Sequence, residues 1–107
     1  MKRCDLVTID LQGDYGKPRP ALVIQSDLFA GHRSVTILLV TSQLRDTPLF
    51  RIAIEPAAQN GLRNRSQVMV DKTQTVPREK IGPAFGRLDD RAMLAVNQAL
   101  IAFLGIA

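Results

Sequence analysis

The chain has 107 residues with 14 Lys or Arg against 10 Asp or Glu, so its formal net charge at pH 7 is +4. This length supports one domain, residues 1–107, with a single modest core. Arginine outnumbers lysine, and an arginine-rich basic chain favours nucleic acid or an acidic protein as its partner, although a modest excess also serves solubility.

The lone cysteine, Cys4, excludes an internal disulfide and suits a reducing cytosol. We expect it in a strand, as a buried and inert thiol. No signal peptide is expected, because Asp5 and Asp10 interrupt the first apolar run. The longest apolar stretch, residues 99–107, is far shorter than the ~20 residues that span a bilayer. We therefore predict a cytoplasmic protein without a membrane segment.

Short apolar runs separated by turn residues dominate the first four-fifths of the chain and predict a mainly β protein. The predicted strands are residues 4–10, 20–26, 35–42, 50–54, 67–76 and 81–88. The second and third of these runs are almost wholly apolar, which indicates strands buried on both faces. Gly82, Pro83 and Gly86 indicate that the sixth strand is bent or lies at an edge of the sheet.

Turn residues mark the connections between these strands. A turn with two glycines is predicted over residues 11–16, and a connection around Gly31 joins the second and third strands. The Asn60-Gly61 pair is a strong turn signal between the fourth and fifth strands. Residues 77–80 are expected to form one helical turn before the last strand.

The final segment changes to a helical period. Asp89 is the expected N-cap, and Gly105 is the expected end of the helix. One helix face is expected to pack in the core, and its residues are Met93, Val96, Leu100 and Phe103. Short strands followed by one terminal helix predict a mainly β fold with a C-terminal α-helix, arranged as a small, partly open β-barrel.

This chain lacks the residues that several common catalytic mechanisms require. His32 is the only histidine and Cys4 the only cysteine, so a zinc cluster and two-histidine acid–base catalysis are excluded. A serine triad would have to recruit His32, for which a solvated position in a loop is the simpler interpretation. No glycine-rich phosphate loop is present, and no metal or nucleotide cofactor is indicated.

The remaining candidate site is a group of basic and polar side chains at the ends of the predicted strands. Arg19 lies between Pro18 and Pro20, which restrict its backbone, and its planar guanidinium suits a phosphate or a carboxylate. If the second and third strands are antiparallel neighbours, Arg19 and Thr41 share one rim of the barrel. They would then cradle a phosphodiester, and in RNA the 2′-hydroxyl supplies the nucleophile. The alternative is that Thr41 merely ends a strand and Arg19 is a solvated charge on a rigid loop.

Several motifs follow one another in a distinctive order. They are Gly16-Lys17-Pro18-Arg19-Pro20 followed by Ala-Leu-Val-Ile-Gln, Thr41-Ser42-Gln43, Asn60-Gly61-Leu62 with Ser66, Val70-Asp71-Lys72-Thr73-Gln74-Thr75-Val76 and Gly86-Arg87-Leu88. In this series, which spans nearly the whole chain, the sequence resembles the MazF/PemK-type mRNA interferase toxins. The proline-arginine-proline element is the most specific part of the likeness.

The resemblance implies an SH3-like barrel, a homodimer and a metal-independent, sequence-specific endoribonuclease. Such an enzyme cuts single-stranded RNA through attack of the RNA's own 2′-hydroxyl and thereby inhibits translation and growth. Members of the family are usually the toxin of a type II toxin–antitoxin pair with an acidic antitoxin, which suits the net charge of +4. Operator DNA is expected as a partner only for the complex with the antitoxin.

The resemblance also implies roles for individual residues. Arg19 would carry the charge that develops in the transition state, and Thr41 would hold the scissile phosphate or aid proton transfer. An acidic residue near the RNA groove is common in the family. The supporting or RNA-contacting positions are Lys17, Ser42, Gln43, Arg63, Arg65 and Asp71.

Two positions depart from the family pattern. Cys4 stands where a glycine is common, and Gln74 stands where an arginine is frequent. Two other functions stay open at this point. One is a gyrase poison of the CcdB type, which would bind its target through the apolar tail of residues 101–106, and the other is a catalytically silent nucleic-acid-binding module.

Overall fold

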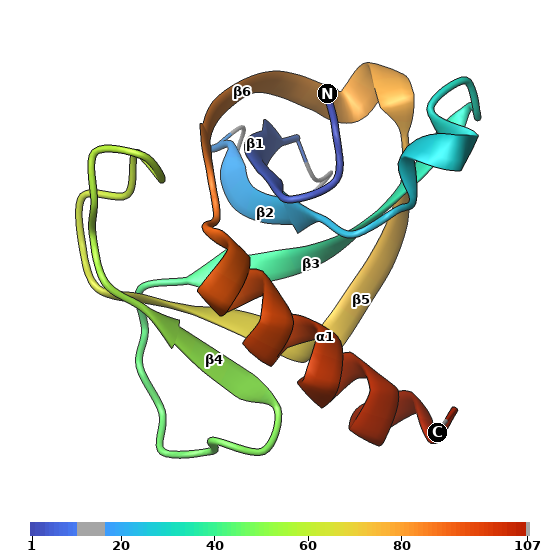
Figure 1. The fold of residues 1–107 in the computed structure, drawn as a ribbon. Coiled ribbons are helices and arrows are strands. Elements are labelled where there is room, and N and C mark those ends of the chain that lie inside the picture. Colours follow the sequence, from blue (N-terminus) through green and yellow to red (C-terminus); the bar gives the residue numbers. More distant parts are fainter. Residues whose placement is uncertain (11–16, 107) are drawn as a thin grey trace.

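A computed structural model describes residues 1–10 and 17–106, so the turn predicted over residues 11–16 lies outside the described residues. Six strands form one antiparallel sheet in the order β4-β5-β3-β2-β1-β6 (Figure 1). Their bounds are β1 Asp5–Ile9, β2 Arg19–Val23, β3 Ser34–Thr41, β4 Arg51–Ile54, β5 Ser66–Pro77 and β6 Ile81–Arg87. All six predicted strands are confirmed, with ends that differ by a few residues.

The sheet curls into a partly open barrel. β6 arches over β1 and β2, while β4 and β5 lie on the far side of β3 (Figure 1). Among the six strands, β4 and β6 are the two edges of the sheet and do not pair with each other. Two short 3-10 turns join the strands, η1 Asp27–Phe29 and η2 Arg78–Lys80, and η2 confirms the helical turn predicted there. The predicted fold class, mainly β with one terminal helix, is confirmed.

Apolar side chains are buried on both faces of the central strands. One cluster lies between the sheet and the terminal helix and includes Leu6, Leu22 and Leu38. A second cluster lies on the opposite face, where neighbouring residues such as Ala21 and Ile37 are fully buried. Because strand side chains alternate between faces, burial of successive residues confirms that β2 and β3 are covered on both sides.

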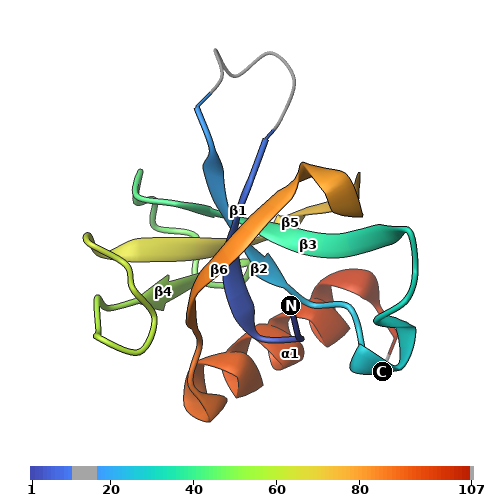
Figure 2. The same ribbon diagram turned by 90° about the horizontal axis from the view of Figure 1, so that it is seen from above.

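The terminal helix α1, Asp90–Leu104, packs across one face of the sheet against β4 and β5 (Figures 1 and 2). The Asp89 side chain caps it by accepting a hydrogen bond from the Ala92 amide at 2.7 Å, and Gly105 ends it in the left-handed conformation. None of the helices in the described part of the chain has the length and apolar character that a bilayer crossing needs.

One predicted core position on this helix is wrong. Met93, Val96 and Leu100 are buried as expected, but the Phe103 side chain is 51% exposed. Phe103 lies on the expected face by helical period, yet the residues of α1 that belong to the buried cluster end at Leu100. The apolar face of the helix is therefore longer than the surface against which it packs.

The prediction that Cys4 belongs to the first strand is also wrong. β1 begins at Asp5, and Cys4 lies in the preceding turn with a φ of 80°, the left-handed region that L side chains disfavour. Its amide donates to the Val23 carbonyl at 2.9 Å, and its carbonyl accepts from the Leu88 amide at 3.0 Å. The side chain is partly buried and packs against the cluster beneath α1. A glycine at this position would adopt the same backbone without strain.

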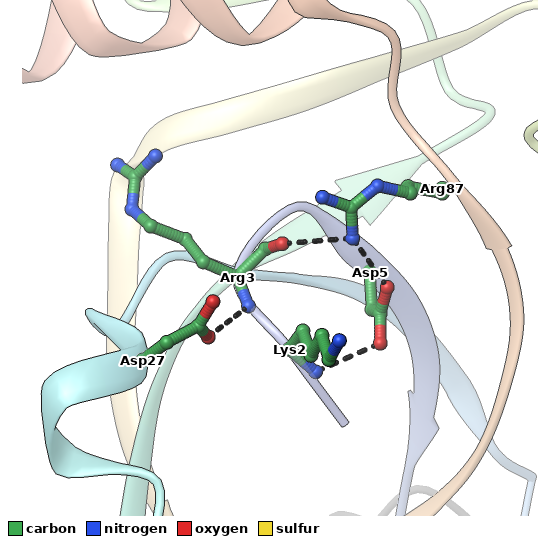
Figure 3. A network of polar contacts seen from close by, with 5 residues as sticks. All are labelled: Lys2, Arg3, Asp5, Asp27 and Arg87. Carbon is green, nitrogen blue, oxygen red and sulfur yellow. Dashed lines mark hydrogen bonds and ion pairs between the residues drawn. The ribbon is translucent and has the colours of Figure 1, made fainter.

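A polar network holds this N-terminal turn in place (Figure 3). The Asp5 carboxylate accepts from the Lys2 amide at 2.8 Å and from the Arg87 guanidinium at 3.0 Å. The same Arg87 group donates to the Arg3 carbonyl at 3.1 Å, and the Arg3 amide donates to the Asp27 carboxylate at 2.8 Å. These contacts tie the turn to β6 and to η1, so the surrounding structure fixes the strained Cys4 backbone.

The connection between β4 and β5 is built around one buried amide, that of Asn60. Its Oδ1 accepts from the Ala57 and Leu62 amides, each at 3.0 Å, and its Nδ2 donates to the Glu55 carbonyl at 2.9 Å. Gly86 on β6 lies directly against the Asn60 backbone, and a Cβ at Gly86 would overlap with the Asn60 carbonyl oxygen. This close approach fixes the connection against β6.

We predict that Cys4→Gly is more stable than Cys4→Ala. Both changes remove the thiol from the core, but only glycine relieves the left-handed backbone, a difference of about 1 kcal/mol in the free energy of unfolding. Urea denaturation of the two variants measures this difference. Equal stability, or a more stable alanine variant, would show that the Cys4 backbone stores no strain.

We also predict that Gly86→Ala lowers the free energy of unfolding by about 1–3 kcal/mol, because the new methyl group meets backbone that cannot easily move. Gly31→Ala is the matched control, since no atom lies within 4 Å of a Cβ built there. The control is expected to change stability by less than about 0.5 kcal/mol. If both variants unfold at the same urea concentration, the close approach of β6 to Asn60 is not a tight contact.

Candidate functional site

The pairing of β2 with β3 brings Arg19 and Thr41 to the same end of the sheet. Ala21 lies opposite Leu39, and Leu22 lies opposite Leu38, in antiparallel register. Continuing that register by two residues sets Arg19, the first residue of β2, opposite Thr41, the last residue of β3. The predicted sharing of one rim is therefore what the strand register produces.

Both residues line one surface groove with a volume of about 300 Å³. The start of β2 and the end of β3 form two of its walls, and the connection between β4 and β5 forms the third. The lining residues are Arg19, Pro20, Val40, Thr41, Ser42, Gln43, Leu62, Arg63, Asn64 and Ser66. Five residues singled out in the sequence thus meet in one place, namely Arg19, Thr41, Ser42, Gln43 and Arg63.

Three residues singled out in the sequence do not line the groove. Arg65 contacts the exposed carboxylate of Glu55 at 2.8 Å. Asp71 lies in the irregular middle of β5, where the pairing with β3 shifts register, and its carboxylate is 4.0 Å from the Lys72 ammonium. Lys17 is exposed and precedes β2.

The sequence did not identify part of the groove wall. Leu62, Asn64 and Ser66 line it because the Asn60 amide fixes the connection that carries them. Ser66 is buried, and its hydroxyl donates to the Asn64 carbonyl at 2.9 Å. The sequence motif Asn60-Gly61-Leu62 with Ser66 was the available clue, but a turn signal does not say which surface the turn completes.

The turn after β3 gives the Thr41 hydroxyl a defined hydrogen-bonding state. The Gln43 amide donates to Thr41 Oγ1 at 3.0 Å. A hydroxyl has one donor hydrogen and two acceptor lone pairs, so this bond uses a lone pair and leaves the hydrogen available. Thr41 can therefore donate to an anionic oxygen in the groove.

The chemistry of the groove suits an anion. Two guanidinium groups, from Arg19 and Arg63, share it with the hydroxyls of Thr41 and Ser42. In the described ranges, 1–10 and 17–106, no group of three His, Cys, Asp or Glu side chains is arranged as a set of metal ligands. A guanidinium beside hydroxyl donors binds a phosphate by charge and by directed hydrogen bonds.

Comparison with known proteins finds a family match over nearly the whole chain. The family model described as PemK-like, MazF-like toxin of type II toxin-antitoxin system matches residues 2–104. The chain is 45% identical over 108 residues to a probable endoribonuclease MazF of Mycolicibacterium smegmatis, with 100% of this chain and 99% of the relative covered. It is 27% identical over 107 residues to endoribonuclease EndoA of Bacillus subtilis, with 94% of this chain and 90% of the relative covered.

Solved structures show the same fold. The Mycobacterium tuberculosis toxin MazF-mt6 superimposes with a TM-score of 0.80 at 25% identity, covering 94% of this chain and 96% of that chain. An endoribonuclease in complex with its cognate antitoxin, from a mycobacterial species, gives a TM-score of 0.84 at 21% identity, covering 100% and 97%. The match over residues 2–104 and the 45% identity place this chain in the family of PemK-like, MazF-like toxins of type II toxin–antitoxin systems.

Proposed function

We propose that this protein is an endoribonuclease toxin that cleaves single-stranded RNA at short sequences without a metal ion. The observation that carries the proposal is that Arg19, Thr41, Ser42 and Arg63 line one groove, at the end of the sheet where β2 begins and β3 ends. Family membership and relatives named as endoribonucleases support the reaction type. Cleavage of messenger RNA stops translation and thereby growth.

The proposed reaction uses the nucleophile that RNA carries. The 2′-hydroxyl loses its proton and its oxygen bonds to phosphorus, while the bond from phosphorus to the 5′-oxygen breaks and that oxygen gains a proton. The products are a 2′,3′-cyclic phosphate and a 5′-hydroxyl. Negative charge grows on the non-bridging oxygens in the transition state, where the Arg19 guanidinium and the Thr41 hydroxyl stabilise it.

The remaining groove residues would bind and orient the RNA. Ser42 and Gln43 follow Thr41 directly, and Arg63 contributes a second cation from the opposite wall. We infer that Lys17, Arg65 and Asp71 make any RNA contact at nucleotides beyond the scissile linkage, because they lie outside the groove. A groove open at the surface admits a single strand whose bases are unstacked, which duplex RNA does not offer.

We infer an acidic antitoxin as the partner that neutralises this toxin, since a net charge of +4 favours an anionic partner over a basic one. We further propose that the toxin acts in the cytoplasm as a homodimer and that it contacts operator DNA only within the complex with its antitoxin. Membership in a family of toxins from type II toxin–antitoxin systems supports the proposed antitoxin.

The exposed end of α1 bears on the gyrase-poison alternative. Phe103, Leu104 and Ile106 are each more than half exposed, as a partner-binding tail would be. That alternative leaves the Arg19 and Thr41 groove without a role, and relatives of this chain are named as endoribonucleases. RNA cleavage is therefore the function that we propose.

We predict that the purified protein cleaves a mixed-sequence single-stranded RNA in the presence of EDTA. Mapping of the fragment ends is expected to show 2′,3′-cyclic phosphates and 5′-hydroxyls at a short recurring sequence. The same RNA in a duplex is expected to resist cleavage. Fragments with 5′-phosphates, or cleavage that stops when EDTA is added, would contradict the proposed reaction.

We predict that Arg19→Ala lowers the cleavage rate by about 10²–10³-fold, the usual effect of losing one group that stabilises an oxyanion. Thr41→Val, which keeps the shape but removes the hydroxyl, is expected to lower the rate by about 10²-fold for the same reason. Arg33→Ala is the matched control, because Arg33 is exposed beside the start of β3 and lies outside the groove. Wild-type rates in either groove variant would remove that residue from the mechanism.

A further inference from the structure

The turn that carries Ser42 and Gln43 rests on two side chains that do not line the groove. Arg51 is the first residue of β4, and Gln67 is the second residue of β5. The register places Gln67 opposite Thr41 on one side and opposite Ala53 on the other, so it lies between β3 and β4. Neither residue was singled out in the sequence, where both read as ordinary polar strand residues.

The side-chain amide of Gln67 forms hydrogen bonds with both the N–H and the carbonyl of the Arg45 backbone. Its Oε1 accepts from the Arg45 amide at 3.0 Å, and its Nε2 donates to the Arg45 carbonyl at 2.9 Å. A side-chain amide used in this way donates one hydrogen bond and accepts another, as the backbone of a neighbouring strand would. The far end of the turn is thereby tied to β5.

Arg51 holds the middle of the same turn. Its Nη1 donates to the Gln43 carbonyl at 2.9 Å and to Gln67 Oε1 at 3.1 Å. Both acceptors are neutral, and within the described ranges no carboxylate lies at ion-pair distance from this guanidinium. The contacts therefore direct Arg51 toward the backbone of the turn rather than toward an ion-pair partner.

These contacts lead to the Thr41 hydroxyl in one further step. The residue that Arg51 holds by its carbonyl is Gln43, and the Gln43 amide donates to Thr41 Oγ1 at 3.0 Å. If Gln43 moves, the hydroxyl loses the donor that occupies its lone pair and can turn its hydrogen away from the groove. The orientation of one hydroxyl thus depends on side chains from β4 and β5.

We infer that Arg51 and Gln67, which we term the Arg51–Gln67 clamp, are positioning residues that set the geometry of Thr41 for RNA cleavage. This inference rests on the proposed function, because it assigns the clamp to the same groove. The clamp acts through the backbone of residues 43–45 and touches no RNA. A positioning role predicts a loss in the rate of the chemical step, whereas a phosphate contact predicts a loss in RNA affinity.

Cleavage kinetics of Arg51→Met, Gln67→Met and the double variant test this inference, with Arg33→Ala as the control that removes a positive charge elsewhere. Each clamp variant is expected to lower kcat by about 10–100-fold with KM for RNA within about threefold of wild type. The kcat of the double variant is expected to be at most about threefold lower than that of the slower single variant, because the two residues act as a unit. Arg51→Lys keeps a donor and is expected to recover part of the loss.

Hydrogen exchange supplies a readout that does not require activity. In Arg51→Met the amides of residues 43–45 are expected to exchange at least about tenfold faster, while amides in the buried part of β3 keep their wild-type rates. Faster exchange throughout the sheet would instead mark Arg51 as a general stability residue and overturn the inference.

Other kinetic results would overturn it as well. A kcat within about threefold of wild type in both single variants would show that the clamp does not set the geometry of Thr41. A loss confined to KM, with a weaker salt dependence, would show that Arg51 is a charge that binds RNA and not a clamp. An inactive wild-type protein would contradict the proposed function alone, since the exchange experiment still reports whether the clamp fixes residues 43–45.

Discussion

The register between β2 and β3 is the constraint on which the candidate site depends. Arg19 and Thr41 line the same groove because the register that sets Ala21 opposite Leu39 brings the start of β2 to the end of β3. A slip of one residue would send every side chain of a strand to the opposite face. Both faces of these strands are buried, with Leu22 beneath α1 and Ala21 in the second cluster, so no slipped register can satisfy either cluster. The register that the core requires is therefore also the register that forms the candidate site.

Much of this arrangement could be predicted from local patterns. Apolar runs identified all six strands, and the antiparallel pairing of two neighbours was enough to bring Arg19 to Thr41. The pattern failed where a long-range contact decides the outcome. Phe103 has the right helical phase but is half exposed, because a helical period carries no information about the length of the surface against which the helix packs.

The site was harder to predict than the fold, because residues alike in sequence have different partners in space. Arg63 and Arg65 are two positions apart and equally basic, yet Arg63 lines the groove whereas Arg65 meets Glu55. Arg51 and Gln67 become informative only when β4, β5 and the turn after β3 are assembled. Such three-way contacts leave no periodic or motif signal. The left-handed backbone at Cys4 was equally hard to predict, because the only indication was that a glycine is common at this position in the family.

The distribution of charge explains how such a groove could act on RNA. No acidic side chain is among the described residues that line it. A carboxylate inside the groove would repel the phosphate and would weaken the effect of each guanidinium. The turn beside Thr41 is held by the neutral amide of Gln67, so its support introduces no negative charge either. No imidazole is among the described residues that line these walls. We attribute the proposed rate acceleration mainly to charge stabilisation and orientation, for which fixed positions of Arg19 and Thr41 are the first requirement.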